Sequence, residues 1–352
     1  MKELLELTAE LVDIPSVSFE EKGVVDHIEK YLHGIPHLST QRIGENLVAR
    51  TEFNKKHRLI LAGHTDTVPG DVDSGARIEG DTCWGLGSAD MKGGLAVMLK
   101  LAKSVLTPRI DTTWIFYARE EVASKHNGLK EILREAPGLL EGDAAVLGEP
   151  TSAAIEAGCQ GTMRFLLTLK GVRAHSARPW MGENAIHRLS GILEALHNYE
   201  HREPVIEGCR YREALQAVSV EGGVAGNVVP DLASLLINLR YAPDRSPEEA
   251  DSHVRDFMAP FMTGEDAIEL VDAAPGALPG LSHPLLATLG EGLEKRAKLG
   301  WTDVAFFAER GIPAINFGPG DATLAHTVDE RVEKGNLEST YRTLKRLLEI
   351  DF

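Results

Sequence analysis

Residues 59–66, LILAGHTD, form an apolar run that leads directly into His64 and Asp66. Short apolar runs of this kind are typical of a buried strand, here residues 59–63. In open α/β sheets, ligands bind at the carboxyl ends of the strands. The stretch therefore predicts a sheet with a polar site where this strand ends.

Strand and helix patterns alternate along the first 150 residues. Residues 113–118 and 144–147 read as further strands, and residues 93–105 as a helix that is apolar nearly all round. This alternation predicts an α/β fold whose mostly parallel sheet is covered by helices. Ser18 and Glu21 have the spacing of a capping box and predict the start of a second helix.

The pattern changes near residue 163 to the order strand, helix, strand, strand, helix, strand, and α/β character returns after residue 275. We therefore expect a catalytic domain in two pieces, residues 1–162 and 275–352, interrupted by an inserted α+β domain of residues 163–274. In the second piece, residues 284–297 are predicted to form a helix.

The composition describes an acidic globular protein of 352 residues with a net charge of −16. Partners such as nucleic acid and anionic membranes require basic patches, so we expect neither. Residues 1–7 lack the apolar core of a signal peptide, and no run approaches the roughly 20 apolar residues that span a bilayer. The three cysteines form no Cys-x-x-Cys motif, which fits a reducing cytoplasm.

Histidines and carboxylates gather at strand ends and in glycine-rich turns. These residue types together suit a pair of divalent, zinc-like ions. The candidate ligands are His64, Asp90 (in GSADMKGG, residues 87–94), Glu121 of the pair Glu120-Glu121, Glu149 (in GEPT, residues 148–151) and His326.

The pair Glu120-Glu121 is the sharpest of these signals. Adjacent carboxylates after an apolar strand repel each other unless a cation lies between them or one keeps its proton. A metal supplies that charge, so that one acid binds it and the other remains as the base. Asp66 can accept a hydrogen bond from His64 and fix its tautomer. Taken singly, each motif also fits a structural role, such as a helix-capping Asp90 or a surface His175.

The motifs in this order, HTDTVP, GSADMKGG, the glutamate pair, GEPT and AHTVDE, resemble the dinuclear-zinc aminoacylase and carboxypeptidase-like family along essentially the whole chain. Acetylornithine deacetylases and succinyl-diaminopimelate desuccinylases belong to it. Residues 155–162, 173–178, 222–231, 300–304 and 317–321 resemble its actinobacterial desuccinylase branch most. The resemblance implies a zinc-exopeptidase-like catalytic domain and a ferredoxin-like inserted domain for dimerisation or as a lid.

The resemblance also implies roles for single residues. The implied cofactors are two Zn²⁺ ions, with Co²⁺ as a substitute, and the implied partner is a second copy of the chain in a homodimer. One zinc would be held by His64 and Glu149, the other by Glu121 and His326, with Asp90 bridging. Catalysis would use Glu120 as general acid/base, Asp66 to orient His64, and His175 from the partner subunit to stabilise the oxyanion. The substrate-contacting positions would be Asn227, Arg240 and Arg178.

The expected reaction is hydrolysis of the amide of N-succinyl-LL-2,6-diaminopimelate. Two departures from the family pattern bear on this expectation. Arg119 precedes the glutamate pair where a small or acidic residue is more common, and Cys159-Gln160 stand where some desuccinylases have an arginine. A sibling N-acyl-amino-acid deacylase and a carboxypeptidase therefore remain alternatives, as does a catalytically silent zinc dimer, against which the retained Glu120 argues.

Overall fold

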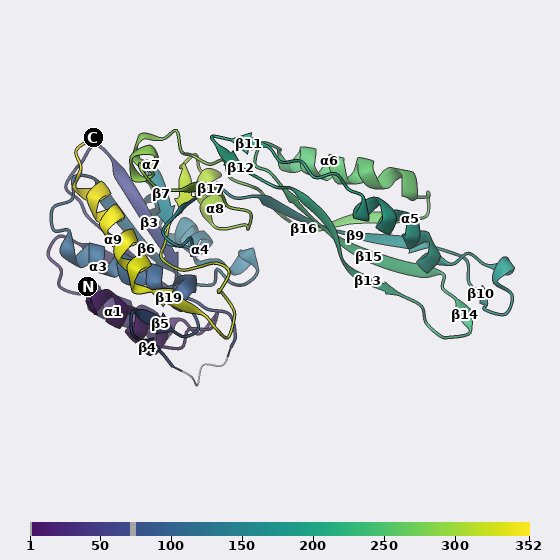
Figure 1. Ribbon diagram of the computed structural model, residues 1–352, viewed down its shortest axis with the longest axis horizontal. Helices are drawn as coiled ribbons and strands as arrows, with labels where there is room; N and C mark the ends of the chain where they lie inside the picture. Colours follow the sequence, from purple (N-terminus) through teal and green to yellow (C-terminus); the bar gives the residue numbers. More distant parts are fainter. Residues whose placement is uncertain (1, 71–74) are drawn as a thin grey trace. The chain divides into compact units, whose positions relative to one another are not determined.

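The computed structural model describes residues 2–70 and 75–352. Of the N-terminal residues 1–7 considered above, Met1 lies outside the described part of the chain. The chain divides into two compact units (Figure 1). The first comprises Met1–Gly158, Pro279–Arg296 and Asp303–Phe352, and the second Cys159–Leu278 with Ala297–Thr302. Residues 297–302, which the sequence placed with the catalytic domain, thus pack with the second unit. Their contacts include Gln160 N donating to Lys298 O and Trp301 Nε1 donating to Pro275 O.

An eight-stranded sheet forms the centre of the first unit. Its four middle strands are parallel, as the alternating pattern predicted, and antiparallel strands flank them on both sides. In spatial order the strands are β1 (Ser39–Ile43), β2 (Asn46–Arg50), β6 (Asp111–Tyr117), β3 (Arg58–His64), β7 (Ala144–Leu147), β18 (Ala314–Asn316), β8 (Ile155–Ala157) and β17 (Lys295–Ala297).

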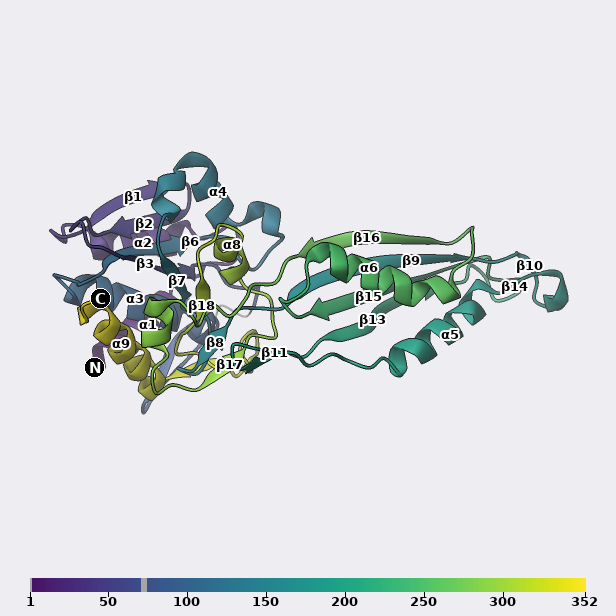
Figure 2. The same ribbon diagram turned by 90° about the horizontal axis from the view of Figure 1, so that it is seen from above.

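Helices cover both faces of this sheet (Figure 2). The helix α3 (Gly93–Ser104) packs on β3 and β6 and is nearly all buried, as its apolar sequence predicted. The helices α1 (Lys2–Val12), α2 (Lys22–Leu32) and α9 (Lys334–Glu349) contact α3, and α7 (Pro284–Leu289) contacts α9. On the other face lie α4 (Gly128–Glu135) and α8 (Val304–Ala308).

Two predictions about helices were wrong. The helix expected over residues 284–297 ends at Leu289, because Gly290 and the left-handed Gly292 (φ 73°) end it before strand β17. The capping box of α2 is also absent, since Ser18 makes no bond to the helix and its hydroxyl donates to Asp66 instead.

A small antiparallel sheet joins two loops of the first unit that carry predicted metal ligands. It consists of β4 (Arg77–Glu79), β5 (Thr82–Trp84) and β19 (Arg331–Glu333). The turn that carries Asp90 follows β5, and the loop that carries His326 precedes β19. Pairing of β5 with β19 therefore brings together loops that lie more than 200 positions apart in the chain.

The second unit has the β-α-β-β-α-β order that the sequence predicted, which is the ferredoxin-like arrangement. Its antiparallel sheet packs one face on two helices over an apolar core. The elements are β9 (Gly161–Lys170), α5 (Ala185–His197), β13 (Ala214–Gly222), β15 (Leu232–Tyr241), α6 (Pro247–Met258) and β16 (Ala267–Ala274), with the sheet order β13-β15-β9-β16.

Short ladders extend this second unit beyond its sheet. The pair β10 (Ala174–His175) and β14 (Val228–Val229) forms a tip beyond the Lys170 end of β9, and β11 (Val205–Ile206) pairs with β12 (Cys209–Arg210). Among the described residues of both units, no helix is long and apolar enough to cross a membrane.

Candidate metal centre

The site lies where three parallel strands end. The strands β6, β3 and β7 are neighbours in the sheet, and their carboxyl ends lead into Glu120, His64 and Glu149 respectively. Because the strands are parallel, these ends lie at the same side of the sheet. The structure thus brings together side chains from distant parts of the chain, as the sequence predicted.

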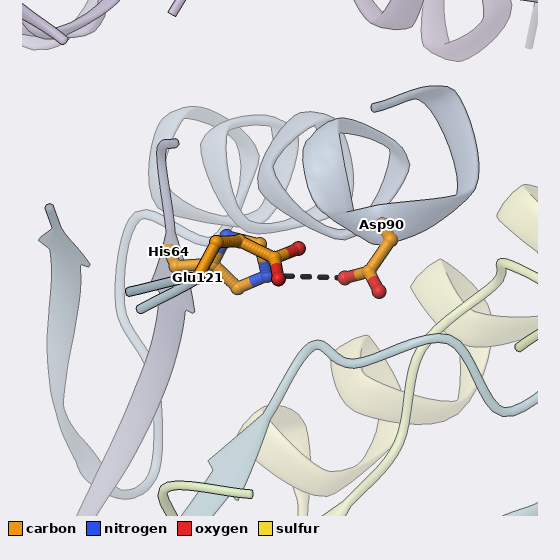
Figure 3. Close-up of side chains that lie close together, drawn as sticks. All are labelled: His64, Asp90 and Glu121. Carbon is orange, nitrogen blue, oxygen red and sulfur yellow. Dashed lines mark hydrogen bonds and ion pairs between the residues drawn. The ribbon is translucent and has the colours of Figure 1, made fainter. Parts of the chain in front are cut away.

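Three side chains offer atoms at metal-binding distances from one another. Single ligand atoms of His64, Asp90 and Glu121 all lie within 4.8 Å of one another (Figure 3). The Nε2 atom of His64 is 3.0 Å from Oδ1 of Asp90. An imidazole with two carboxylates is a donor set that zinc accepts, so the trio fits a divalent ion.

A second histidine completes the cluster. Nε2 of His326 lies 2.8 Å from Oε1 of Glu121 and 3.7 Å from Oδ2 of Asp90. Asp90 therefore faces His64 with one carboxylate oxygen and His326 with the other. A carboxylate that presents its two oxygens to two histidines has the orientation that a bridging ligand needs. The residue His326 itself has left-handed backbone (φ 63°), which for a residue with a side chain is a strained conformation.

The ring of His64 is oriented by the main chain of Asp66. Nδ1 lies 2.9 Å from the backbone carbonyl oxygen of Asp66 and 3.6 Å from its carboxylate. A hydrogen bond from Nδ1 to that carbonyl leaves Nε2 facing Asp90. Burial lowers the pKa of His64, but the interactions with Asp66 and Asp90 outweigh it and hold the pKa well above its usual range.

The carboxylate of Asp66 is used mainly to fix the glutamate pair. It accepts hydrogen bonds from the backbone N–H groups of Glu120 (3.0 Å) and Glu121 (3.1 Å) and from the hydroxyl of Ser18 (2.7 Å). Burial raises the pKa of Asp66, yet these donors together with His64 bring the pKa below its usual value. Asp66 therefore positions both His64 and the two glutamates.

Arg119 makes the turn that presents these two N–H groups. Its backbone is left-handed (φ 62°), and its guanidinium pairs with Glu131 of α4. Glu131 in turn accepts from Nδ2 of Asn46, whose Oδ1 accepts from Ala118 N. The unusual arginine of the sequence is thus part of a polar network that anchors this turn.

Glu120 differs from its neighbour in having no direct partner. Its carboxylate makes no hydrogen bond or ion pair with any described residue, whereas Glu121 contacts His326. Burial raises the pKa of Glu120 well above its usual value, and the charges of Glu149, Asp303 and Glu121 add to the effect while His64 opposes it. A carboxylate that lies beside the candidate metal ligands without a hydrogen bond or ion pair to them is suited to proton transfer.

Buried polar groups around the cluster carried no assigned role in the sequence. Asp303 at the start of α8 accepts from Nδ2 of Asn127 (2.8 Å), and its charge raises the pKa of Glu120. Glu330, which is 2% exposed, accepts through Oε1 from the backbone N–H groups of Ala89 and Asp90, both at 3.0 Å. The only sequence signal for these groups is that Asp303 and Glu330 lie within the family-like stretches.

Glu330 fixes the Asp90 turn from the opposite loop, and a buried lysine supports the same turn. Lys92 is 2% exposed and donates to the backbone oxygen of Ile14 (2.8 Å). Burial lowers the pKa of Lys92 to about 8, although Glu330 and Asp13 favour its charge. The Asp90 turn is therefore held by groups from two other segments, the loop before β19 and the segment after α1.

Four predicted residues belong to the second unit. His175, Arg178 and Asn227 gather at its tip, where Ser176 N donates to Asn227 O and Arg178 N to His175 O. Arg240 lies at the other end of β15, opposite Thr162. With a rise of about 3.3 Å per residue, the eight steps of β15 from Leu232 to Arg240 alone span roughly 26 Å. The second unit of one chain therefore does not bring the four residues into one site.

The cysteines take no part in the cluster. Cys83, Cys159 and Cys209 are buried and free of disulfides. Burial raises the pKa of Cys83 to about 12, with the charge of Asp13 adding to the effect. A thiol in this state is neither a nucleophile nor a metal ligand.

Comparison with known proteins agrees with this fold. Residues 60–350 match the model of peptidase family M20/M25/M40. The chain belongs to this family of peptidases, and it is a metal-dependent amide hydrolase. The resemblance drawn from the motifs is therefore confirmed at the level of the family.

Two relatives match nearly the whole length of the chain. The chain is 51% identical over 348 residues to the putative succinyl-diaminopimelate desuccinylase DapE of Mycobacterium tuberculosis, covering 98% of this chain and 97% of that protein. It is 45% identical over 352 residues to the succinyl-diaminopimelate desuccinylase of Corynebacterium glutamicum, covering 97% and 95%. The structure of YxeP from Bacillus subtilis, described as a dinuclear metal binding peptidase from the M20 family, matches the fold with a TM-score of 0.71 at 16% identity, covering 99% of this chain and 97% of that one.

Proposed function

We propose that this protein is a zinc-dependent succinyl-diaminopimelate desuccinylase, which hydrolyses N-succinyl-LL-2,6-diaminopimelate to succinate and LL-2,6-diaminopimelate. The observation that carries the chemistry is the cluster of His64, Asp90 and Glu121 with the uncommitted carboxylate of Glu120 beside it. The substrate follows from the two relatives named for this activity, which match nearly the whole chain.

Two Zn²⁺ ions, for which Co²⁺ can substitute, are the proposed cofactors. His64 and Glu149 would hold one ion and Glu121 and His326 the other, with Asp90 shared between them. The approach of the two Asp90 oxygens to different histidines supports this assignment. When bound, such ions supply a Lewis acid for the amide carbonyl and ionise water near neutral pH.

The protein's own residues then manage the protons. A carboxylate oxygen of Glu120 takes a proton from the attacking water and returns it to the amide nitrogen as the carbon–nitrogen bond breaks. The products are the carboxylate of succinate and the free amine. The carboxylate of Asp66 keeps Glu120 in place by accepting a hydrogen bond from the backbone N–H of Glu120. The backbone carbonyl of Asp66 binds Nδ1 of His64, so that Nε2 of His64 faces the cluster.

We also propose that the active protein is a cytoplasmic homodimer in which His175 of one subunit serves the active site of the other. Nδ1 of His175 accepts a hydrogen bond from Ala177 N (3.0 Å), so that Nε2 carries the proton and can donate to an oxyanion. The separation of His175, Arg178 and Asn227 from Arg240 supports a site shared between chains. The edge strand β13, with Val218 54% and Val220 59% exposed, offers an apolar surface for pairing.

The decisive experiment measures zinc-dependent release of succinate from N-succinyl-LL-diaminopimelate, with N-acetylornithine in parallel and Glu120→Ala as the blank. Turnover of the succinyl substrate alone, lost in the blank, supports the proposal. A preference for the acetyl substrate would instead identify a sibling deacylase with the same metal centre. Failure of both at full zinc occupancy would refute the assignment of the substrate.

A mixing experiment tests the shared site. Inactive His175→Ala and Glu120→Ala subunits are unfolded together, refolded and assayed. Partial recovery of activity is expected, because some dimers then contain one site with both groups intact. If no activity returns although the mixed dimer forms, His175 does not act across the dimer.

A further inference from the structure

A cavity of about 390 Å³ opens beside the candidate metal centre in the first unit, and His326 forms part of its wall. His326 contacts both Glu121 and Asp90 through Nε2, so the cavity adjoins the cluster directly. The remaining described wall comes from the segment after β3, from β4, from β5 and the turn that follows it, and from the loop before β19. This is space for a substrate group next to the reacting centre.

The cavity combines an apolar wall with a single cationic group. Val68 and Leu86 contribute apolar surface, and among the described residues that line the cavity Arg77 is the only arginine or lysine. The carboxylate of Glu330, which also lines it, is already engaged through Oε1 by two backbone N–H groups. The protein has a net charge of −16, yet the described wall of this cavity presents a cation.

The Arg77 side chain is held over an aromatic ring and remains accessible. Its Cζ lies 5.2 Å from the ring centroid of Trp84, which also lines the cavity. Among the described residues, its one ion pair, with Glu79 at 3.3 Å, joins side chains that are 59% and 57% exposed. An exposed pair of this kind contributes little, so a ligand carboxylate can replace it at small loss. The planar guanidinium can then bind both carboxylate oxygens at once.

We propose that this cavity is a carboxylate subsite in which Arg77 recognises an acid group of the substrate. This inference rests on the proposed function, since the substrate named there carries carboxylates on both its succinyl and its amine side. It also supplies the cation that succinyl recognition requires in a chain with Cys159-Gln160 in place of an arginine.

The test compares Arg77→Met with Arg331→Met. Arg331 is a matched control because its Cζ also lies over Trp84, at 4.7 Å, while it does not line the cavity. Values of kcat and KM are measured on N-succinyl-LL-diaminopimelate, on N-acetyl-LL-diaminopimelate, and on N-succinylcadaverine, which has no carboxylate on its amine side. Loss of one charge-assisted hydrogen-bonding partner predicts a roughly 10- to 100-fold fall in kcat/KM for Arg77→Met, mostly through KM.

The substrates distinguish the two sources of the carboxylate. If Arg77 binds the succinyl group, both succinyl substrates are affected and the acetyl substrate is not. If Arg77 binds the amine side, both diaminopimelate substrates are affected and N-succinylcadaverine is not. A change of less than twofold on all three, or an equal loss in Arg331→Met, overturns the subsite.

A binding measurement separates failure of the subsite from failure of the proposed function. Calorimetric titration of zinc-loaded protein with succinate and, separately, with LL-diaminopimelate needs no turnover. Should the wild type hydrolyse none of the substrates, the proposed function fails, but binding of either compound that is weakened by Arg77→Met and kept by Arg331→Met still supports a carboxylate site. Absence of binding of both compounds by an inactive wild type overturns both proposals.

Discussion

Asp66→Asn should destabilise the metal-free protein, although it removes one negative charge from a site that contains several carboxylates. Asp66 is 1% exposed, and its two oxygens accept from Glu120 N, Glu121 N and the Ser18 hydroxyl. Asparagine keeps one acceptor oxygen and turns an N–H₂ group toward the remaining donors. Hydrogen bonds to a charged group contribute about 1.5–3 kcal/mol each, so the loss of one or two predicts a fall of about 2–4 kcal/mol in the free energy of unfolding.

Glu120→Gln should have the opposite effect on the free energy of unfolding, so the two variants can be compared directly. The pKa of Asp66 is lowered, so the fold favours its ionised form, whereas burial and neighbouring acids raise the pKa of Glu120. Neutralising Glu120 therefore relieves repulsion and raises the free energy of unfolding, while hydrolysis is lost. Such a residue is kept for activity at the expense of stability.

The pH dependence has a defined sign for each residue. The stabilising effect of ionised Asp66 is present above its unfolded pKa of about 3.9 and disappears as the pH falls through its lower folded pKa. The deficit of Asp66→Asn should thus shrink in acid. The destabilising effect of ionised Glu120 is absent below its unfolded pKa of about 4.3 and grows as the pH rises above it, so the gain of Glu120→Gln should grow with pH.

The assay is urea unfolding in chelator, followed for the transition of the first unit, with Ser18→Ala as a control that removes a single donor to Asp66. That control removes one hydrogen bond to a charged group and should lose about 1.5–3 kcal/mol. The reasoning would be refuted if Asp66→Asn were as stable as the wild type near neutral pH, or if Glu120→Gln lost stability to the same extent.

Three further outcomes are expected. Glu330→Ala leaves the N–H groups of Ala89 and Asp90 without their acceptor and should weaken zinc binding at the Asp90 turn about 10- to 100-fold. Glu330→Gln keeps an acceptor oxygen, so its zinc affinity should fall far less. An alanine variant with the zinc affinity of the wild type in a competitive titration would contradict this. Chelation should abolish hydrolysis without unfolding the protein by circular dichroism, and added Zn²⁺ or Co²⁺ should restore it; full activity in chelator would exclude metal catalysis. Arg188→Met removes a two-point ion pair with Asp266, whose side chain is 0% exposed, and should destabilise the second unit by about 2–4 kcal/mol in thermal unfolding. Burial raises the pKa of Asp266, but Arg188 and backbone donors bring it below its usual value, so this loss should fade as the pH drops below about 4; a loss that is independent of pH would refute the argument.

Much of the first unit could be read from local patterns. The strands over residues 59–63, 113–118 and 144–147 and the apolar helix over residues 93–105 are each specified by a continuous stretch, and all are present. The capping box failed for a physical reason: α2 begins only at Lys22, with Glu21 as its N-cap, so Ser18 lies before the helix and its hydroxyl donates to the charged carboxylate of Asp66 instead of accepting from a helix N–H group.

From the residue patterns alone, candidate metal ligands could be placed at strand ends and in glycine-rich turns, because both are local features of the chain. The tertiary structure alone decided that Asp90 faces two histidines, that Asp66 holds the glutamate pair, and that Glu330 holds the Asp90 turn. It also decided that His175 lies in a ladder beyond the Lys170 end of β9, whereas Arg240 pairs with Thr162 near the other end of that strand. These are hydrogen bonds and separations between residues up to 240 positions apart, and such long-range contacts leave no period or spacing in the sequence.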